Sequence, residues 1–146
     1  MKTALTIRNA EVVLPVRTER TNVSVINGRI CTIGNEIPDV GEVIDADGLF
    51  LLPGIIDPQV HFREPGADHK EDLHSGSCAA AAGGVTSFLD MPNNTPPVIT
   101  RQRMQGKKQL AAEKSVVNYG FFMGATPDNL EELNAVENVC GIKIFM

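Results

Sequence analysis

The sequence has no apolar run long enough to cross a membrane. Its longest such run, Leu49 to Ile56, has eight residues and is interrupted by a proline and a glycine, whereas a membrane-spanning helix needs about 20 apolar residues. The first residues also lack the uninterrupted apolar core of a secretory signal peptide, because Arg8 and Glu11 lie among them. We therefore predict a cytoplasmic protein with no membrane partner.

Basic runs are absent as well. The chain has 13 lysines and arginines against 18 aspartates and glutamates, which gives a formal net charge of −5. A nucleic-acid-binding surface normally carries a patch or stripe of positive charge. The charge pattern therefore argues against a nucleic-acid partner.

Cysteines are few, and their number is odd. Cys31, Cys78 and Cys140 show no CxxC spacing that would suggest a metal or redox motif. A disulfide framework needs paired cysteines and an oxidising compartment. We predict that the three behave as small buried hydrophobic residues in a reducing compartment.

The first 52 residues predict a small β module. Runs rich in Val, Ile and Thr begin the chain at TALTIRN and AEVVLPV. The next two runs meet at Asn27-Gly28, a dipeptide typical of a two-residue hairpin turn. A further pair of strands is predicted on either side of Asp47-Gly48.

Residues 53–146 predict strands that alternate with helices. The apolar runs are IIDPQVHF, VTSFLDM, SVVNYGFFMG and CGIKIFM. Of the helices between them, the first ends at Gly83-Gly84, the second is capped by Thr100, and the third is capped by Thr126 with Pro127 at its first position. This order implies parallel strands with crossover helices, and near-continuous apolar strands are expected to be buried on both faces.

Two parallel architectures fit this order, a doubly wound sheet and a (β/α)₈ barrel. The glycine-rich phosphate fingerprint of a dinucleotide fold is absent after the first strand. Polar residues instead follow the strand ends, where barrel active sites lie. These polar residues are His61, Arg63 and Glu64 after the first strand, Asp90, Asn93 and Asn94 after the second, and Lys143 within the fourth. The sequence therefore favours the first half of a (β/α)₈ barrel, with four strands and three helices.

The end of the first strand carries candidate ligands. Gln59, His61 and Arg63 alternate along one face of an extended segment. Two side chains at this spacing can converge on one metal ion, and a histidine nitrogen suits zinc. A single histidine at a strand end is also a common hydrogen-bonded loop residue, so both interpretations of His61 stay open.

Arg63 and Asn93 are candidates for binding an anion. The planar guanidinium of Arg63 suits a carboxylate, and the Asn93 amide offers a donor and an acceptor. The alternative for Arg63 is a salt bridge with Glu64, Asp57 or Asp90. The alternative for Asn93 is ordinary turn chemistry in the loop that follows a proline.

Lys143 is an unusual residue for a buried strand. It lies between Ile142 and Ile144, and an unpaired buried ammonium costs several kcal/mol. Burial favours the neutral amine, which can add to carbon dioxide and lose a proton to form an anionic carbamate with two oxygen ligands. The alternative is a lysine that reaches water at an incomplete strand end.

Three segments together resemble the dihydroorotase family of the amidohydrolase superfamily. They are LLPGIIDPQVHFREPG, HKEDLHSGSCAAAAGGVTSFLDMPNN and GIKIFM, and the resemblance covers essentially the whole chain. It implies a β-sandwich portion at residues 1–52 and an incomplete (β/α)₈ barrel at residues 53–146. The implied activity is metal-dependent, usually zinc-dependent, reversible hydrolysis of the ring amide of dihydroorotate to N-carbamoyl-L-aspartate in pyrimidine biosynthesis.

The resemblance also assigns roles to metal-site residues. His61 matches the second histidine of the strand-one metal motif, and Gln59 stands where the first histidine is found. Lys143 matches the lysine that is carboxylated and bridges two metals in many members. Asp57 matches an acidic residue that supports the metal ligands from behind.

The substrate-binding residues implied by the resemblance are Arg63 and Asn93, which match the pair that binds the substrate carboxylate. The general base and the later histidines of the family come from strands five to eight, so they are expected beyond residue 146. The chain is thus expected to be an inactive fragment by itself. The implied partners are a second copy of the chain or aspartate transcarbamoylase.

Two alternatives to a dihydroorotase remain. The first is a related cyclic amidase of the hydantoinase or allantoinase type, against which Arg63 argues. The second is a non-catalytic dihydroorotase-like scaffold for aspartate transcarbamoylase, which Gln59 favours because an amide is a weak zinc ligand.

Overall fold

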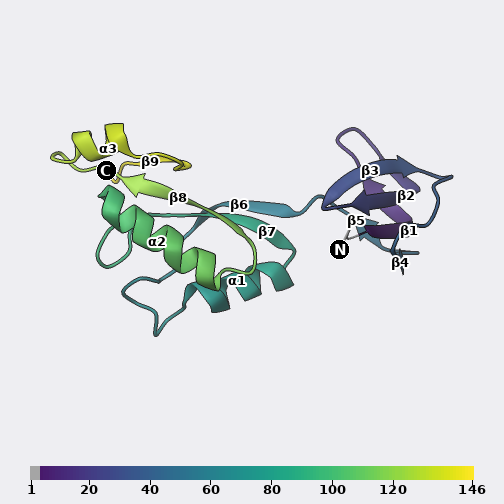
Figure 1. Cartoon of the computed structure of the whole chain (residues 1–146), viewed down its shortest axis with the longest axis horizontal. Coiled ribbons are helices and arrows are strands. Elements are labelled where there is room, and N and C mark those ends of the chain that lie inside the picture. Colours follow the sequence, from purple (N-terminus) through teal and green to yellow (C-terminus); the bar gives the residue numbers. More distant parts are fainter. Residues whose placement is uncertain (1–3) are drawn as a thin grey trace. The chain divides into compact units, whose positions relative to one another are not determined.

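The computed structural model describes residues 4–146, which divide into two compact units at Pro53 and Gly54. The elements are numbered along the chain (Figure 1). In order they are β1 Ala4–Val13, β2 Thr18–Ile26, β3 Arg29–Gly34, β4 Glu42–Asp45, β5 Phe50–Leu51, β6 Ile55–Val60, α1 Leu73–Ala82, β7 Val85–Asp90, α2 Arg101–Lys114, β8 Asn118–Gly124, α3 Leu130–Ala135 and β9 Gly141–Lys143. Among these described elements, no helix is long and apolar enough to cross a membrane.

The first unit is a mixed five-stranded sheet with the order β3-β2-β1-β4, in which β5 also pairs with β1. The predicted turn at Asn27-Gly28 joins β2 and β3, and both residues have positive φ (52° and 72°). Two consecutive positive φ angles are what the favoured two-residue hairpin turn requires. The small core of this unit contains Ala10, Val12 and Val23.

Two expectations for this unit need correction. The two predicted runs, TALTIRN and AEVVLPV, are not separate strands: their residues from Ala4 to Val13 form one strand, β1, which is irregular between Ile7 and Ala10. The strands on either side of Asp47-Gly48 exist, but they do not pair with each other. Both β4 and β5 instead pair in parallel with β1. The long strand β1 supplies backbone N–H and C=O groups to both of these short strands.

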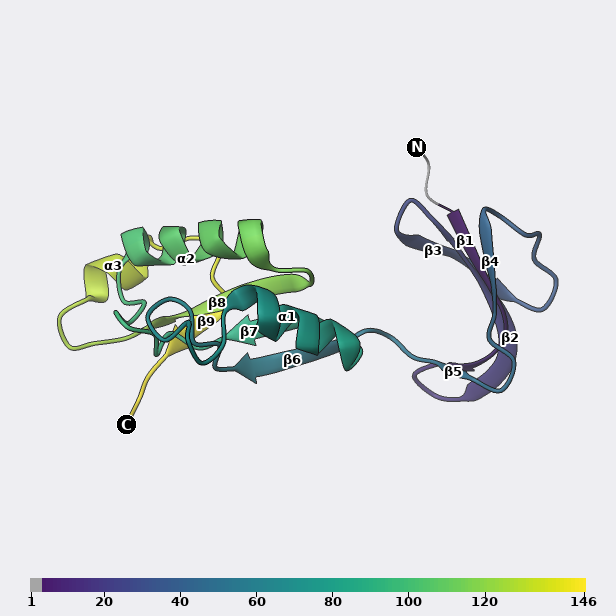
Figure 2. The ribbon, with the colours of Figure 1, turned by 90° about the horizontal axis from the view of Figure 1, so that it is seen from below.

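The second unit is a parallel sheet in the order β6-β7-β8-β9. The helices α1 and α2 lie beside each other against this sheet (Figure 2). Each new strand is added next to the previous one, and the order never reverses. A doubly wound sheet has a reversal of strand order at its switch point, whereas successive addition is the arrangement of a barrel. The observed order therefore favours the barrel architecture over the doubly wound sheet.

Local hydrogen bonds explain where α1 and α2 begin. Thr100 caps α2 as predicted, by accepting from the Arg103 N–H at 3.3 Å. Asp72, which was not predicted as a cap, caps α1 by accepting from the Ser75 N–H at 2.7 Å. The cap predicted for the third helix was wrong. Helix α3 begins after Asn129, whose side-chain oxygen accepts from the Thr126 N–H instead, so Thr126 and Pro127 precede the helix.

The core of the second unit lies between the helices and the sheet. Its fully buried members are apolar residues from α1, α2, β7, β8 and the loop before α2, namely Leu73, Phe88, Val98, Met104, Ala111, Phe121 and Met123. The prediction that the strands are buried on both faces was wrong for residues 4–146. Ile56 is 63% exposed and Ile142 is 49% exposed.

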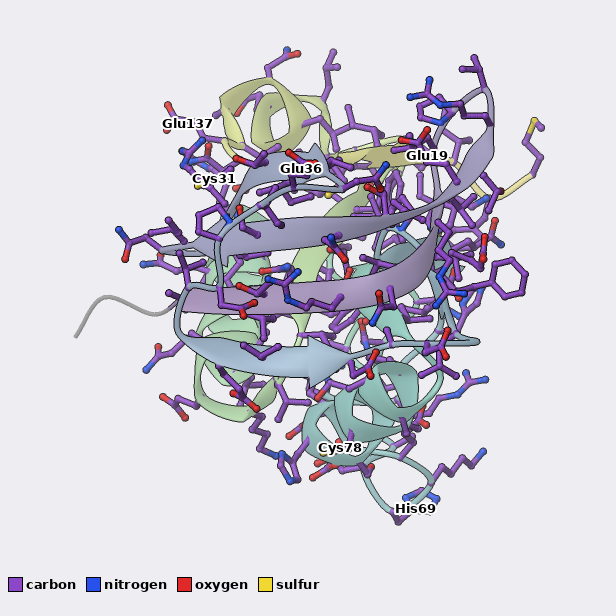
Figure 3. The ribbon with its side chains drawn as sticks, turned by 90° about the vertical axis from the view of Figure 1, so that its right-hand side faces the viewer. Glu19, Cys31, Glu36, His69, Cys78 and Glu137 are labelled. Carbon is purple, nitrogen blue, oxygen red and sulfur yellow. The ribbon has the colours of Figure 1, made fainter. Side chains whose placement is uncertain are left out.

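The cysteine prediction was also wrong in one respect. Cys31, Cys78 and Cys140 are free thiols, as expected, but all three are exposed. Figure 3 shows Cys78 on α1 and His69 in the loop before that helix, both at the surface.

Candidate active site

The predicted site residues lie at one edge of the parallel sheet. His61 directly follows β6, Asn93 follows β7 by three residues, and Lys143 is the last residue of β9. Because these strands are parallel, their carboxyl ends share one edge. This edge is where active sites of (β/α)₈ barrels are built.

His61 and Asn93 are in direct contact. The Nδ1 atom of His61 lies 2.9 Å from the Asn93 side-chain oxygen. An amide oxygen only accepts hydrogen bonds, so this contact requires a proton on Nδ1, and in the neutral ring Nε2 then has the free lone pair. This is the form in which a histidine binds a metal, with its other nitrogen hydrogen-bonded to an oriented acceptor. Within residues 4–146 the Asn93 side chain makes no further hydrogen bond, and Asn93 is exposed.

Arg63 is exposed, and among residues 4–146 it takes part in none of the three salt bridges considered from the sequence. Glu64 pairs with Lys114, and Asp90 pairs with Lys107 at 2.7 Å. Two of the three acids are therefore already neutralised by lysines from α2. The Arg63 side chain therefore lies at the surface of its loop and is not paired with either of these acids.

The third acid, Asp57, bonds to its own strand. Its Oδ1 accepts from the Gln59 N–H at 3.0 Å. Asp57 is half-buried, whereas Gln59 is exposed. The aspartate thus orients the backbone two residues before His61, which is compatible with the supporting role predicted for it.

Lys143 does not occupy the doubly buried strand expected from the sequence. The residue itself is half-buried, but the neighbouring Ile144 is 64% exposed. Its ammonium lies 5.4 Å from the centre of the Phe145 ring, within the range of a cation–π contact. The expectation of burial was wrong because, within residues 4–146, β9 is the last strand of the sheet and pairs with β8 alone.

The donor atoms present fit a zinc ion only in part. His61 offers a free imidazole nitrogen, and Lys143 would become a ligand as a carbamate. Within residues 4–146 there is no group of three or more His, Cys, Asp or Glu side chains arranged to bind a metal. A catalytic zinc usually takes three ligands from protein, so the described residues supply part of a metal site.

Behind the site is a cluster that joins Asp90 and Asn94, two of the polar residues noted after the second strand, to Lys107, which the sequence did not reveal. We call Lys107, Asp90 and Asn94 the buried lysine cluster; Asp90 and the Lys107 side chain are fully buried, and Asn94 is 8% exposed. Burial raises the pKa of Asp90 and lowers the pKa of Lys107, and their mutual attraction opposes both shifts. A lysine in the middle of a polar helix gives no sequence signal that it is buried.

Comparison with known proteins decides the family. A family model described as "Amidohydrolase family" matches residues 50–143. This chain belongs to the amidohydrolase family. That match includes all four strands of the parallel sheet and every predicted site residue.

The relatives within the amidohydrolase family carry more than one name. An allantoinase from Deinococcus radiodurans is 41% identical over an alignment of 150 positions, which covers 100% of this chain and 34% of the relative. A dihydroorotase from Methanothermobacter thermautotrophicus is 42% identical over 125 residues, which are 86% of this chain and 27% of the relative. The chain thus spans about a third of the length of these curated relatives.

Solved structures of two hydantoinases share the fold. An L-hydantoinase from Arthrobacter aurescens superposes with a TM-score of 0.88 at 26% identity, over 94% of this chain and 32% of that one. A D-hydantoinase gives a TM-score of 0.82 at 31% identity, over 99% of this chain and 33% of that one. The predicted fold class, half of a (β/α)₈ barrel preceded by part of a small β-sandwich, is confirmed.

Proposed function

We propose that the full-length protein is a metal-dependent hydrolase of cyclic amides and that its substrate is dihydroorotate, which it converts reversibly to N-carbamoyl-L-aspartate. The observation that carries this proposal is that the Arg63 side chain is exposed and not paired with the neighbouring acids. Its guanidinium is exposed and is not paired with Glu64 or Asp90, and it comes two residues after His61. A charged fork beside the candidate ligand suits a substrate that bears a carboxylate.

Each side chain then has a separate task. Arg63 and the Asn93 amide nitrogen bind the substrate carboxylate, which fixes the ring amide relative to His61. His61 and a carboxylated Lys143 would hold zinc, and Gln59 is a weak candidate ligand. Zinc, when bound, activates water and polarises a carbonyl oxygen. Asp57 keeps the backbone before His61 in place through its bond to Gln59.

Allantoin or hydantoin hydrolysis is the second candidate, and the Deinococcus radiodurans allantoinase, 41% identical across the chain, favours it. Neither of those rings carries a carboxylate. An assay of the full-length protein on dihydroorotate, hydantoin and allantoin separates these functions. A preference for either of the last two would overturn the dihydroorotate proposal.

A non-catalytic scaffold is the third candidate, and Gln59 in a ligand position favours it. Metal analysis of the full-length protein distinguishes this role from an enzyme. Near-stoichiometric zinc together with turnover of any of the three cyclic amides would exclude the scaffold. A protein with neither metal nor turnover would exclude the enzyme.

The substitution Arg63→Lys should raise KM for dihydroorotate at least about tenfold in the full-length protein. Lysine keeps the charge but loses the bidentate fork, and a charge-assisted hydrogen bond contributes about 1.5–3 kcal/mol. Steady-state kinetics measures the change, and the thermal unfolding temperature should stay the same because Arg63 is exposed.

Arg29→Lys provides the matched control, since Arg29 is an exposed arginine of β3 in the other unit. Its KM should equal that of the unmodified protein. An unchanged KM for Arg63→Lys would mean that this arginine does not bind the substrate carboxylate.

The isolated segment 1–146 should not hydrolyse dihydroorotate. Its parallel sheet has four strands, whereas the barrel needs eight, and it contains at most two good zinc ligands. The general base is also expected elsewhere, and loss of such a group lowers the rate by about 10²–10⁴-fold. Exposed Ile142 and Ile144 on and beside β9 should promote self-association.

Hydrolysis assays and size-exclusion chromatography of the purified segment test this expectation. Turnover above the uncatalysed rate by a soluble monomer would contradict it.

A further inference from the structure

The ammonium of Lys107 is the centre of the buried lysine cluster. It projects from the middle of α2 and lies 2.7 Å from Asp90 Oδ2. It also donates to the Asn94 side-chain oxygen at 2.6 Å and to the Met91 carbonyl at 3.1 Å. All three partners belong to the end of β7 or the loop after it, which also carries Asn93. One buried charge thus connects a helix to the loop of the candidate site.

The partners of Lys107 in turn bind the loop after β6. Asp90 Oδ1 accepts from the Phe62 N–H at 3.0 Å. The Asn94 amide nitrogen donates to the Phe62 carbonyl at 3.3 Å and to the Glu64 carbonyl at 2.9 Å. The backbone on both sides of Arg63 is therefore bonded to two side chains that Lys107 orients.

Contacts with the protein interior also hold residues 62–64 in place. The Phe62 ring lies edge-on against the buried Phe88, with the ring centres 4.6 Å apart. The Glu64 side chain is buried, accepts from the Leu73 N–H at 2.9 Å and pairs with Lys114. Lys107 and Lys114 are seven residues apart, so they lie on one face of α2. The side chains of Phe62 and Glu64 point into the protein while Arg63 stays exposed.

The ion pair itself is not an obvious source of stability. Removing two charges from water costs free energy that their attraction often does not recover, and apolar replacements of such pairs are often neutral or stabilising. What a buried pair does supply is a defined geometry, because its partners have few alternatives. Here that geometry is imposed on the two loops that carry His61, Arg63 and Asn93.

We propose that Lys107 is a positioning residue of the candidate active site: through Asp90 and Asn94 it holds the 62–64 backbone and the loop after β7 so that Arg63, Asn93 and His61 face a common ligand. The expected effect of Lys107 on substrate turnover rests on the proposed function. The expected effect of Lys107 on the His61–Asn93 contact does not, because that contact exists in the protein without substrate.

The decisive variant of the full-length protein is the double substitution Asp90→Asn and Lys107→Met. It removes both buried charges and keeps an oxygen that can accept from Phe62. A second variant, Asn94→Ala, leaves the ion pair intact but removes the bonds to the Phe62 and Glu64 carbonyls. Lys108→Met is the matched control, since Lys108 is the next residue of α2 and donates to the Glu137 carbonyl outside the cluster.

Three measurements are made on each variant: the thermal unfolding temperature, the ¹⁵N resonances of the His61 imidazole after histidine labelling, and kcat/KM for dihydroorotate. The double variant and Asn94→Ala should shift the His61 resonances and lower kcat/KM between about 10-fold and 100-fold. The His69 resonances should not move. The double variant should unfold close to the temperature of the unmodified protein, and Lys108→Met should change none of the three.

Unmoved His61 resonances in the double variant and in Asn94→Ala would overturn the proposal and leave the cluster a structural ion pair. The proposal also fails if Lys108→Met moves these resonances equally. If the double variant does not fold, the His61 resonances of Asn94→Ala test the proposal. If the unmodified protein hydrolyses none of the cyclic amides, the proposed function fails, while the His61 resonances still test the positioning.

Discussion

Lys143→Ala should remove metal and activity together from the full-length protein. Alanine cannot form the carbamate that would supply two oxygen ligands, so a metal held there would lose one of its protein ligands. Loss of the hydrogen-bond partners of metal ligands already lowers affinity or activity 10–100-fold, and loss of a ligand should exceed about 100-fold. Elemental analysis of the purified variant and a dihydroorotate assay measure the two effects.

Short carboxylic acids such as acetate should restore part of the metal content and part of the activity of Lys143→Ala, because a free carboxylate can occupy the place of the carbamate. Lys108→Ala is the control and should retain both metal and activity, since Lys108 contacts the Glu137 carbonyl and not the candidate site. Full metal content in Lys143→Ala would exclude the ligand role, whatever the activity.

Lys107→Met should lower the free energy of unfolding by about 3–5 kcal/mol, the usual cost of removing one partner of a buried ion pair. Asp90 would remain fully buried without its counter-charge. The double substitution Asp90→Asn and Lys107→Met should recover most of this loss, because neither charge remains. Urea unfolding of the single variants, the double variant and the unmodified protein forms the cycle that measures the coupling. Additive losses in that cycle would contradict a coupled pair.

The instability of Lys107→Met should depend on pH with a definite sign. Burial already raises the pKa of Asp90 above its ordinary value, and the attraction of Lys107 opposes that rise. Without Lys107 the pKa of Asp90 rises further, so the folded variant binds the carboxyl proton more tightly than the unfolded chain does. Stability must then increase as the pH falls through the folded pKa of Asp90. Unfolding curves at descending pH should show the deficit of the variant shrinking.

Much of the fold could be predicted from local sequence patterns. The alternation of apolar runs with capped helices after residue 53 indicated parallel β/α units, and the polar residues at the strand ends favoured a barrel over a doubly wound sheet. Asn27-Gly28 forms its hairpin turn and Thr100 caps α2 as expected. These features succeed because turn and cap chemistry depends on a few neighbouring residues.

Strand partners, a helix start and burial were decided by tertiary structure. The runs around Asp47-Gly48 are strands, but their partner is β1 rather than each other, since hydrogen-bonding partners depend on segments far apart in the chain. Asn129 rather than Thr126 lies at the start of α3 because it also bonds to the Ile99 and Gly124 carbonyls. The exposure of Cys31 could not be foreseen, because residue type alone does not distinguish a buried cysteine from an exposed one.

The sequence by itself determined which residues are candidates for chemistry: His61, Arg63, Asn93 and Lys143 are identifiable from residue type, spacing and resemblance. The tertiary structure decided how the first three are arranged. His61 contacts Asn93, and Arg63 stays unpaired with Glu64 and Asp90 because α2 supplies lysines to both acids. Lys107 lies 17 residues from Asp90 in the chain, and no local pattern distinguishes it from a surface lysine. Only the tertiary fold brings its buried ammonium into contact with Asp90 and Asn94.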